Sequence, residues 1–221
     1  MQAVELPLLE LTPLPPASDR DLSQEAAAAE LVIAVSPSAV VLGRAWWPQA
    51  WPPACTVAGV GTGTARAWRI AGAQRVIEPP GDGDSEALLA HPTLQTVAGQ
   101  RIVILRGEGG RDLLGPTLRS RGADVVEWLC YRRQAPADLV AKLATLLAAP
   151  PDAWVVTSSE ALAHLEAAWP EWAARSKPVF APHPRIAEAA KKAGWLTVLS
   201  ESGDAGLMTA LRTWFDAADH E

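Results

Sequence analysis

Short apolar runs recur along the chain, and each stops at a turn of small or polar residues before a helical pattern begins. These runs cover residues 31–35, 56–60, 101–106, 153–156, 178–182 and 196–200. Apolar runs of this length are typical of buried strands, and their alternation with helices is typical of βα units. The pattern therefore predicts an α/β protein with parallel sheets and right-handed crossover connections.

Two stretches of the chain share one order of elements and one spacing. Each starts at a serine-rich turn and ends at an Ala-Gly pair, and the separation is 36 residues both from Ser36 to Gly72 and from Ser158 to Gly194. Equal spacing over several elements favours two related α/β halves. The alternative is that the spacing reflects only the βα repetition common to all α/β chains.

Two extended segments separate the halves. Residues 2–16 carry prolines that exclude a long helix, and residues 123–136 are rich in β-forming residues and end at a proline. We expect two flavodoxin-like or Rossmann-like lobes joined by a two-strand β hinge, with a cleft between the lobes. The expected boundaries are a hinge strand at 1–16, a first lobe at 17–124, a second hinge strand at 125–136 and a second lobe at 137–221.

Composition narrows the class of protein. The net charge of −6 argues against general nucleic-acid binding, for which a basic surface is the usual requirement. Cys55 and Cys130 are too few for a disulfide framework or a structural zinc site, and Cys130 lies in an apolar run that predicts a buried small side chain. No apolar run approaches the ~20 residues of a membrane span, and no signal peptide is evident. We therefore expect a cytoplasmic protein without membrane partners.

The turns after the predicted strands are the candidate ligand site, because ligands of open parallel sheets bind at the carboxyl ends of the strands. Hydroxyls, bare backbone N–H groups and arginines in these turns would suit several oxyanions. The alternatives are tight turns for the glycines and helix capping for the serines and threonines. The candidate residues are Ser36, Ser38, Thr62, Thr64, Arg106, Gly107, Gly109, Gly110, Arg111, Thr157, Ser158 and Ser159.

Motifs for other chemistries are missing from the sequence. The Gly-rich turn fits neither a P-loop nor a dinucleotide fingerprint, and no histidine, cysteine or carboxylate cluster has metal spacing. Tyr131, the only tyrosine, follows the apolar run of the second extended segment and precedes Arg132 and Arg133. Its phenol could donate a proton to a leaving group, with the arginines favouring the phenolate. The alternative is an aromatic side chain that only packs at the lobe boundary.

The segment RIVILRGEGGRDLLGPTLRSRGADVVEWLCYRR closely resembles the central signature of bacterial uroporphyrinogen-III synthases. The segments PLLELTPL, AGVGTGTARA, DSEALL, VVTSSEAL and PHPRIAEAA also resemble family elements, in family order, from about Pro7 to Leu211. The resemblance implies two α/β lobes on a two-strand ladder. It also implies a lyase of tetrapyrrole (heme) biosynthesis that closes linear hydroxymethylbilane into uroporphyrinogen III, with inversion of ring D and loss of water. Neither a cofactor nor a metal is implied, and we expect a monomer.

The resemblance also assigns roles to residues. Its substrate carries eight carboxylates, so the candidate turns would bind acetate and propionate side chains. Ser85, from DSEALL, and Arg185, from PHPRIAEAA, join the binding residues. Tyr131 matches the hinge tyrosine of the family, the best candidate for assisting departure of the hydroxyl. Holding a flexible chain in a curled shape is expected to dominate catalysis.

Two features depart from the family pattern. Family members usually begin with a strand–helix unit before PLLEL, and we expect that strand, absent from this sequence, in the interior of the second lobe's sheet. Where many members have a Gly-Pro-Thr-Thr-Ala-like turn, residues 182–187 read PHPRIA, so Arg185 would replace a hydroxyl as carboxylate partner. The alternatives are a two-lobed binding module for a polyanionic small molecule, inactive because of the shortened N-terminus, and, more weakly, a sugar-phosphate enzyme.

Overall fold

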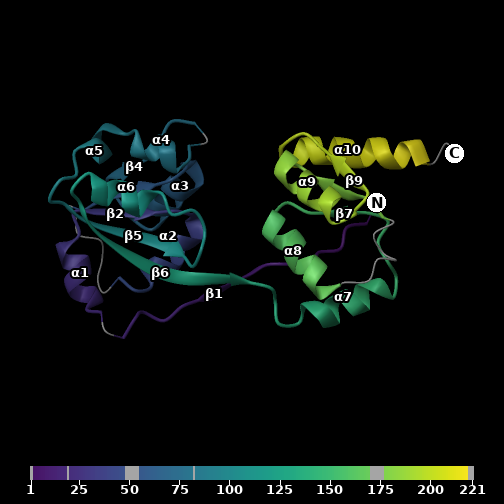
Figure 1. The fold of residues 1–221 in the computed structure, drawn as a ribbon, viewed down its shortest axis with the longest axis horizontal. Coiled ribbons are helices and arrows are strands. Elements are labelled where there is room, and N and C mark those ends of the chain that lie inside the picture. Colours follow the sequence, from purple (N-terminus) through teal and green to yellow (C-terminus); the bar gives the residue numbers. More distant parts are fainter. Residues whose placement is uncertain (1, 19, 48–54, 82, 170–176, 219–221) are drawn as a thin grey trace. The chain divides into compact units, whose positions relative to one another are not determined.

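The computed structural model describes residues 2–18, 20–47, 55–81, 83–169 and 177–218 (Figure 1). The chain divides into two compact units. The six-stranded unit is Leu11–Arg133, and the three-stranded unit combines Met1–Glu10 with Gln134–Glu221. Both units contain a parallel sheet with helices, so the predicted parallel α/β fold is confirmed.

The six-stranded unit is built on one sheet. The ladders that join β6, β5, β2, β3 and β4 in turn are all parallel. The two segments expected as hinge strands are neighbours at one edge of this sheet, where the Leu14 N–H donates to the Cys130 carbonyl at 3.0 Å. The strand order is β1 (Glu10–Pro13), β6 (Asp124–Gln134), β5 (Arg101–Gly107), β2 (Leu31–Ala34), β3 (Thr56–Gly59) and β4 (Val76–Ile77).

Helices cover both faces of the six-stranded sheet. Along β5, Val103 and Leu105 join the core cluster of one face, whereas Ile102 and Ile104 join that of the other. Burial on both faces explains why this strand is a continuous apolar run rather than an alternating one. The first face is covered by α1 (Leu22–Ala28), α2 (Pro37–Arg44) and α3 (Thr62–Ile70), and the second by α4 (Ser85–Leu89), α5 (Pro92–Gln95) and α6 (Leu114–Ser120).

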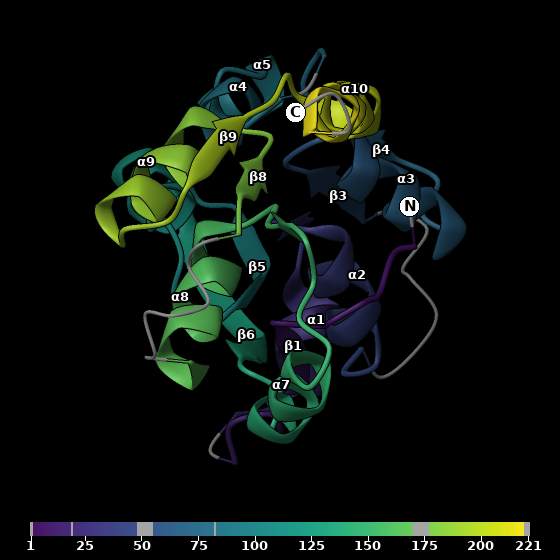
Figure 2. The same ribbon diagram turned by 90° about the vertical axis from the view of Figure 1, so that its right-hand side faces the viewer.

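The three-stranded unit places helices on both faces of a smaller sheet. Val179 and Ala181 pack into a core shared with the helices α8 and α9. Phe180 points to the other face and meets Trp214 of α10 edge-to-face, with ring centroids 6.1 Å apart. In Figure 2, α10 lies on the opposite side of β8 from α9. The elements are α7 (Leu139–Leu147), β7 (Trp154–Val155), α8 (Ser159–Ala168), β8 (Val179–Ala181), α9 (Pro184–Lys192), β9 (Thr197–Leu199) and α10 (Gly203–Ala218).

The strands of the small sheet follow one another as β7, β8 and β9, each hydrogen-bonded in parallel to the next. The position expected for the strand–helix unit of the family stays a prediction.

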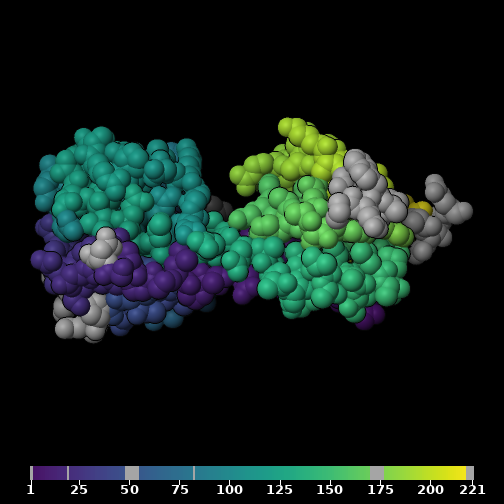
Figure 3. Space-filling view, turned by 60° about the horizontal axis from the view of Figure 1, so that its bottom comes forward, coloured from purple at the N-terminus to yellow at the C-terminus, as the bar shows by residue number. Residues whose placement is uncertain are grey.

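The N-terminal segment is extended, as its prolines require, but only part of it is a strand. Leu6 and Leu8 pack against the core of the three-stranded unit, and the Leu8 carbonyl lies 2.7 Å from Nδ1 of His164 on α8. The next part of the chain, through β1 and α1, forms part of the surface of the six-stranded unit, coloured purple in Figure 3. Among the described residues, no helix combines the length and apolar character needed to cross a bilayer.

Candidate functional site

The carboxyl edge of the six-stranded sheet gathers the turns predicted to bind ligand. β5, β2 and β3 are parallel neighbours, so the turns that follow them emerge at the same edge. The backbone continues this alignment, since the Val35 N–H donates to Leu105 O at 3.1 Å and the Val60 N–H donates to Ala34 O at 3.3 Å. A Cβ placed on Gly63 would lie 3.7 Å from Cγ of Pro37, so the first turns of α2 and α3 are adjacent.

Tyr131 reaches this edge from β6. Its side chain is almost fully buried, at 1% exposure, and its hydroxyl oxygen lies 3.0 Å from the Ser36 hydroxyl oxygen. Either hydroxyl is able to donate in this hydrogen bond. Arg133 donates to the same phenol oxygen at 3.4 Å, and its guanidinium carbon stands 5.6 Å from the ring centroid. The structure thus brings together Tyr131, Ser36 and Arg133, the last of which is missing from the carboxylate-binding residues expected from the sequence.

Gly107 leaves the space that the Tyr131 ring occupies. A β-bulge between Arg106 and Gly107 shifts the register, so that Gly107 lies opposite Tyr131. A Cβ on Gly107 would come within 2.5 Å of the ring carbon Cε2 of Tyr131. The Glu108 N–H also donates to the Tyr131 carbonyl at 2.8 Å. The Gly-rich turn and the tyrosine therefore form one packed unit.

Gly109 and Gly110 have a conformational reason to be glycine. Their φ angles are 70° and 78°, in the left-handed region that glycine adopts without steric cost. A tight turn therefore accounts for these two residues without a ligand. Their backbone N–H groups remain candidates for binding an anion.

Arg106 lies on the other face of the sheet from Tyr131. Its guanidinium donates to Glu127 at 2.8 Å and to the Gly109 carbonyl at 2.8 Å. Glu127 also accepts from Arg119 of α6, the helix on the second face, whereas Tyr131 belongs to the core cluster of the first face. The sequence did not reveal this separation, because it depends on the bulge.

Arg111 also has a carboxylate partner within the protein. It forms an exposed ion pair with Glu86 of α4. Both arginines of the Gly-rich turn, Arg106 and Arg111, thus have carboxylate partners within the protein.

The helix starts at this edge differ in how they are capped. Ser36 caps α2, because its hydroxyl oxygen accepts the Ala39 N–H at 3.1 Å. In α3 the N-cap is Gly61, which provides no side-chain cap, so the capping role considered for Thr62 and Thr64 is wrong. Thr62 is exposed and Thr64 is buried, at 4% exposure.

Ser38 and Ser85 occupy first-turn positions without being the cap. Ser38 is half-buried in the first turn of α2. Ser85 is the first residue of α4, whose cap is Asp84, which accepts the Ala87 N–H at 2.9 Å. Neither residue is therefore needed to start its helix.

The remaining predicted residues lie in the three-stranded unit, at the carboxyl ends of β7 and β8. Thr157 is exposed, and Ser158 caps α8 by accepting the Ala161 N–H at 3.4 Å. The Ser159 hydroxyl is buried and has no hydrogen-bond partner among the described residues. Arg185 is exposed in the first turn of α9, where the His183 ring is the cap.

The two cysteines are poor nucleophiles. Burial raises the pKa of the Cys55 thiol to about 11 and that of the Cys130 thiol to about 12. Cys130 is fully buried, as predicted, and its thiol stays protonated at neutral pH. In the described part of the chain, no three His, Cys, Asp or Glu side chains are grouped as a metal site would require.

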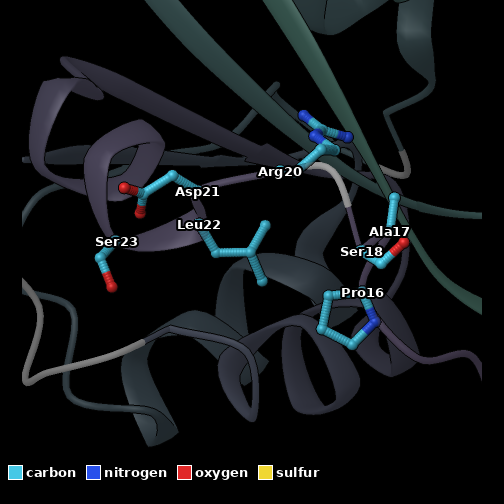
Figure 4. A pocket seen from close by; sticks show the side chains of 7 residues that line it. All are labelled: Pro16, Ala17, Ser18, Arg20, Asp21, Leu22 and Ser23. Carbon is cyan, nitrogen blue, oxygen red and sulfur yellow. The ribbon is translucent and has the colours of Figure 1, made fainter.

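An open depression of about 610 Å³ lies elsewhere, at the start of α1 (Figure 4). Arg20 at its rim is turned toward β6, where it donates to the Glu127 carbonyl at 2.7 Å. None of the predicted site residues contributes to the lining, so this depression is not the candidate site. Its lining residues are Pro16, Ala17, Ser18, Arg20, Asp21, Leu22 and Ser23.

We predict that Gly107→Ala displaces the Tyr131 ring. The added methyl group overpacks the contact, so the free energy of unfolding should fall by about 1–3 kcal/mol in chemical denaturation. Gly63→Ala is the matched control, because its Cβ would meet only an ordinary contact in a helix, and it should be neutral or slightly stabilising. Equal stability of the Gly107→Ala variant and the wild type would show that the ring does not depend on this glycine.

Comparison with known proteins identifies the family. Residues 1–209 match the family model described as "Uroporphyrinogen-III synthase HemD". The chain is 33% identical over 225 residues to the uroporphyrinogen-III synthase of Escherichia coli (strain K12), covering 95% of this chain and 90% of that protein. It is 34% identical over 194 residues to the enzyme of Salmonella typhimurium, covering 83% and 78% of the two chains.

Solved structures share the fold. The uroporphyrinogen-III synthetase from Helicobacter pylori aligns with a TM-score of 0.66 at 12% identity, over 95% of this chain and 91% of that one. A mutant uroporphyrinogen III synthase from Thermus thermophilus aligns with a TM-score of 0.58 at 21% identity, over 98% and 89%. Together with the family match over nearly its whole length, these findings mean that the chain belongs to the uroporphyrinogen-III synthase family.

Proposed function

We propose that this chain closes linear hydroxymethylbilane into uroporphyrinogen III, inverting ring D and releasing one water. The observation that carries the proposal is the Tyr131 hydroxyl, held at the carboxyl edge of a parallel sheet by Ser36 and beside a Gly-rich turn. The reaction breaks a carbon–oxygen bond without hydrolysis or oxidation, so the enzyme is a lyase. The alternative of an inactive binding module is not favoured, because nearly the whole chain resembles enzymes of this activity.

Backbone groups supply much of the proposed binding of the eight substrate carboxylates. The starts of α2 and α3 are adjacent at the edge of the sheet, and helix N-termini favour negative charge. In α3 the cap has no side-chain acceptor for the first N–H groups, which leaves them for a ligand. A protein with a net charge of −6 is thus able to hold a polyanion locally.

The proposal extends to the three-stranded unit. Thr157, Ser158, Ser159 and Arg185 stand at the carboxyl ends of its strands and would bind further carboxylates. We also propose that this enzyme is a monomer, that it works in the cytoplasm, and that its two lobes are joined by a two-strand hinge.

Tyr131 is the proposed proton donor for the leaving hydroxyl. Arg133 only donates hydrogen bonds, and the Ser36 oxygen already accepts the Ala39 N–H. When the Ser36 hydroxyl donates to the phenol oxygen, the phenol's own proton is free for the substrate. Its transfer to the hydroxymethyl oxygen lets the carbon–oxygen bond break and water leave, giving a protonated azafulvene (azafulvenium) cation and a phenolate.

The later steps restore the enzyme. The α-carbon of ring D that already carries the bridge to ring C attacks the azafulvenium carbon and gives a spiro intermediate. Its bond to that bridge carbon then breaks, and the unsubstituted α-carbon of ring D bonds to the freed bridge carbon, which inverts the ring. The proton lost from this second α-carbon returns to the phenolate, so one water is the only by-product. Ser36 and Arg133 stabilise the phenolate in the interval because both donate to its oxygen.

The type of isomer formed tests the proposed function. Hydroxymethylbilane generated by a coupled synthase should be converted mainly into uroporphyrinogen III, and chromatographic separation of the oxidised products measures the isomer ratio. The same mixture without this protein gives uroporphyrinogen I, the spontaneous product. A mixture that still contains only the type I isomer after the purified protein is added would refute the proposal.

Substitutions at Tyr131 and Ser36 test the mechanism. Tyr131→Phe should lower kcat by about 100-fold with little change in KM, because it removes the proton but keeps the packed ring. The variant should still form the type III isomer above the spontaneous rate, since holding the substrate supplies much of the catalysis. Ser36→Thr keeps a hydroxyl and a helix cap, so it should retain far more activity than Ser36→Ala.

Asp21→Ala is the control for loss of a helix cap. Asp21 caps α1 by accepting the Gln24 N–H at 3.0 Å and does not contact Tyr131. This variant should lose about 0.5–2 kcal/mol of stability and keep the wild-type kcat. An unchanged kcat in Tyr131→Phe would exclude Tyr131 as the proton donor.

A further inference from the structure

Arg133 differs from the other arginines around the Gly-rich turn. Arg106 is paired with Glu127 at 2.8 Å, and Arg132 is paired with Glu108 through two hydrogen bonds of 2.5 and 3.0 Å. Arg111 is paired with Glu86. In contrast, Arg133 is exposed and forms no ion pair with any carboxylate of the described residues. It is therefore a cation whose charge is not compensated by a neighbouring side chain.

The strand geometry puts Arg133 on the same side of β6 as the proton donor. Side chains two residues apart on a strand point to the same face, so Arg133 follows Tyr131 whereas Arg132 turns away toward Glu108. The guanidinium of Arg133 lies over the Tyr131 ring, with its carbon 5.6 Å from the centroid. Arg106 occupies the opposite face of the sheet.

Most hydrogen-bonding capacity of this guanidinium is unused. Among the described residues, the Arg133 side chain makes one hydrogen bond, a long one of 3.4 Å from Nη2 to the Tyr131 hydroxyl oxygen. A guanidinium carries several further N–H donors in a planar fork that matches both oxygens of a carboxylate. Arg133 is thus able to bind a carboxylate with two parallel hydrogen bonds while it remains beside the phenol.

We propose that Arg133 binds one acetate or propionate side chain of the substrate and fixes it next to the Tyr131 hydroxyl. The inference rests on the proposed function and deepens it, because it names the side chain that meets a substrate carboxylate closest to the proton donor. In this arrangement, one residue couples recognition of the substrate with orientation of the reacting group. Arg106, held by Glu127, maintains the Gly-rich turn instead.

Steady-state kinetics of Arg133→Gln test the proposal. Loss of a charge-assisted, two-pronged interaction should raise KM for hydroxymethylbilane by about 10- to 100-fold, with a much smaller change in kcat. Arg133→Lys keeps the charge but loses the fork, so its KM should lie between those of the wild type and Arg133→Gln. The matched control is Arg132→Gln, which makes the same change in net charge at the adjacent exposed position and should leave KM within about twofold of the wild type.

Direct binding separates this inference from the proposed function. Uroporphyrin III, the oxidised product with its eight carboxylates, serves as the probe, and its binding is followed by quenching of tryptophan fluorescence. Its Kd should rise by about 10-fold or more in Arg133→Gln and stay unchanged in Arg132→Gln, whether or not the protein forms the type III isomer. Equal Kd values for the two variants would overturn the role of Arg133, and so would a fall in kcat at unchanged KM. Circular dichroism serves as the control that the variants are folded.

Discussion

The packing of the Tyr131 ring against the bare backbone of Gly107 is the contact on which the candidate site depends. It is possible only because the β-bulge after Arg106 puts Gly107 opposite the tyrosine. The ring then carries its hydroxyl to Ser36, the residue that starts α2. The Tyr131 side chain thus links β5, β6 and α2, and the backbone of Gly107 and the start of α2 fix the position of the proposed proton donor.

At this edge of the sheet, few positively charged side chains are free to bind a ligand. The glutamates of the unit pair with most of the nearby arginines, and the Arg132 guanidinium holds the pKa of Glu108 below its usual range through a hydrogen bond. The uncompensated positive potential then comes from helix starts, backbone N–H groups and Arg133. Such a distribution suits a ligand with several dispersed carboxylates better than one with a single phosphate.

The sequence was sufficient for the parallel α/β class of the fold but not for the side-chain partners in the site. The apolar run at residues 31–35 predicted a buried strand, and all four residues of Leu31–Ala34 are buried in the structure. Ser36 was also placed correctly, at the turn that follows this strand. The face on which Tyr131 lies was not predictable, because the bulge puts the neighbours Cys130 and Tyr131 on the same face of β6 without changing the apolar pattern. For the same reason, nothing in the sequence distinguished Arg133 from its neighbour Arg132.

A double-mutant cycle between Ser36 and Tyr131 tests the central claim most directly. If Ser36 acts only by holding the Tyr131 hydroxyl, Ser36→Ala should lower kcat in the wild-type background but have almost no further effect in a Tyr131→Phe background. The account predicts a coupling of about 1–2 kcal/mol between the two substitutions, within the range of residues in direct contact. Effects on kcat that simply multiply in the double variant would mean that the two hydroxyls act independently, and would contradict the account.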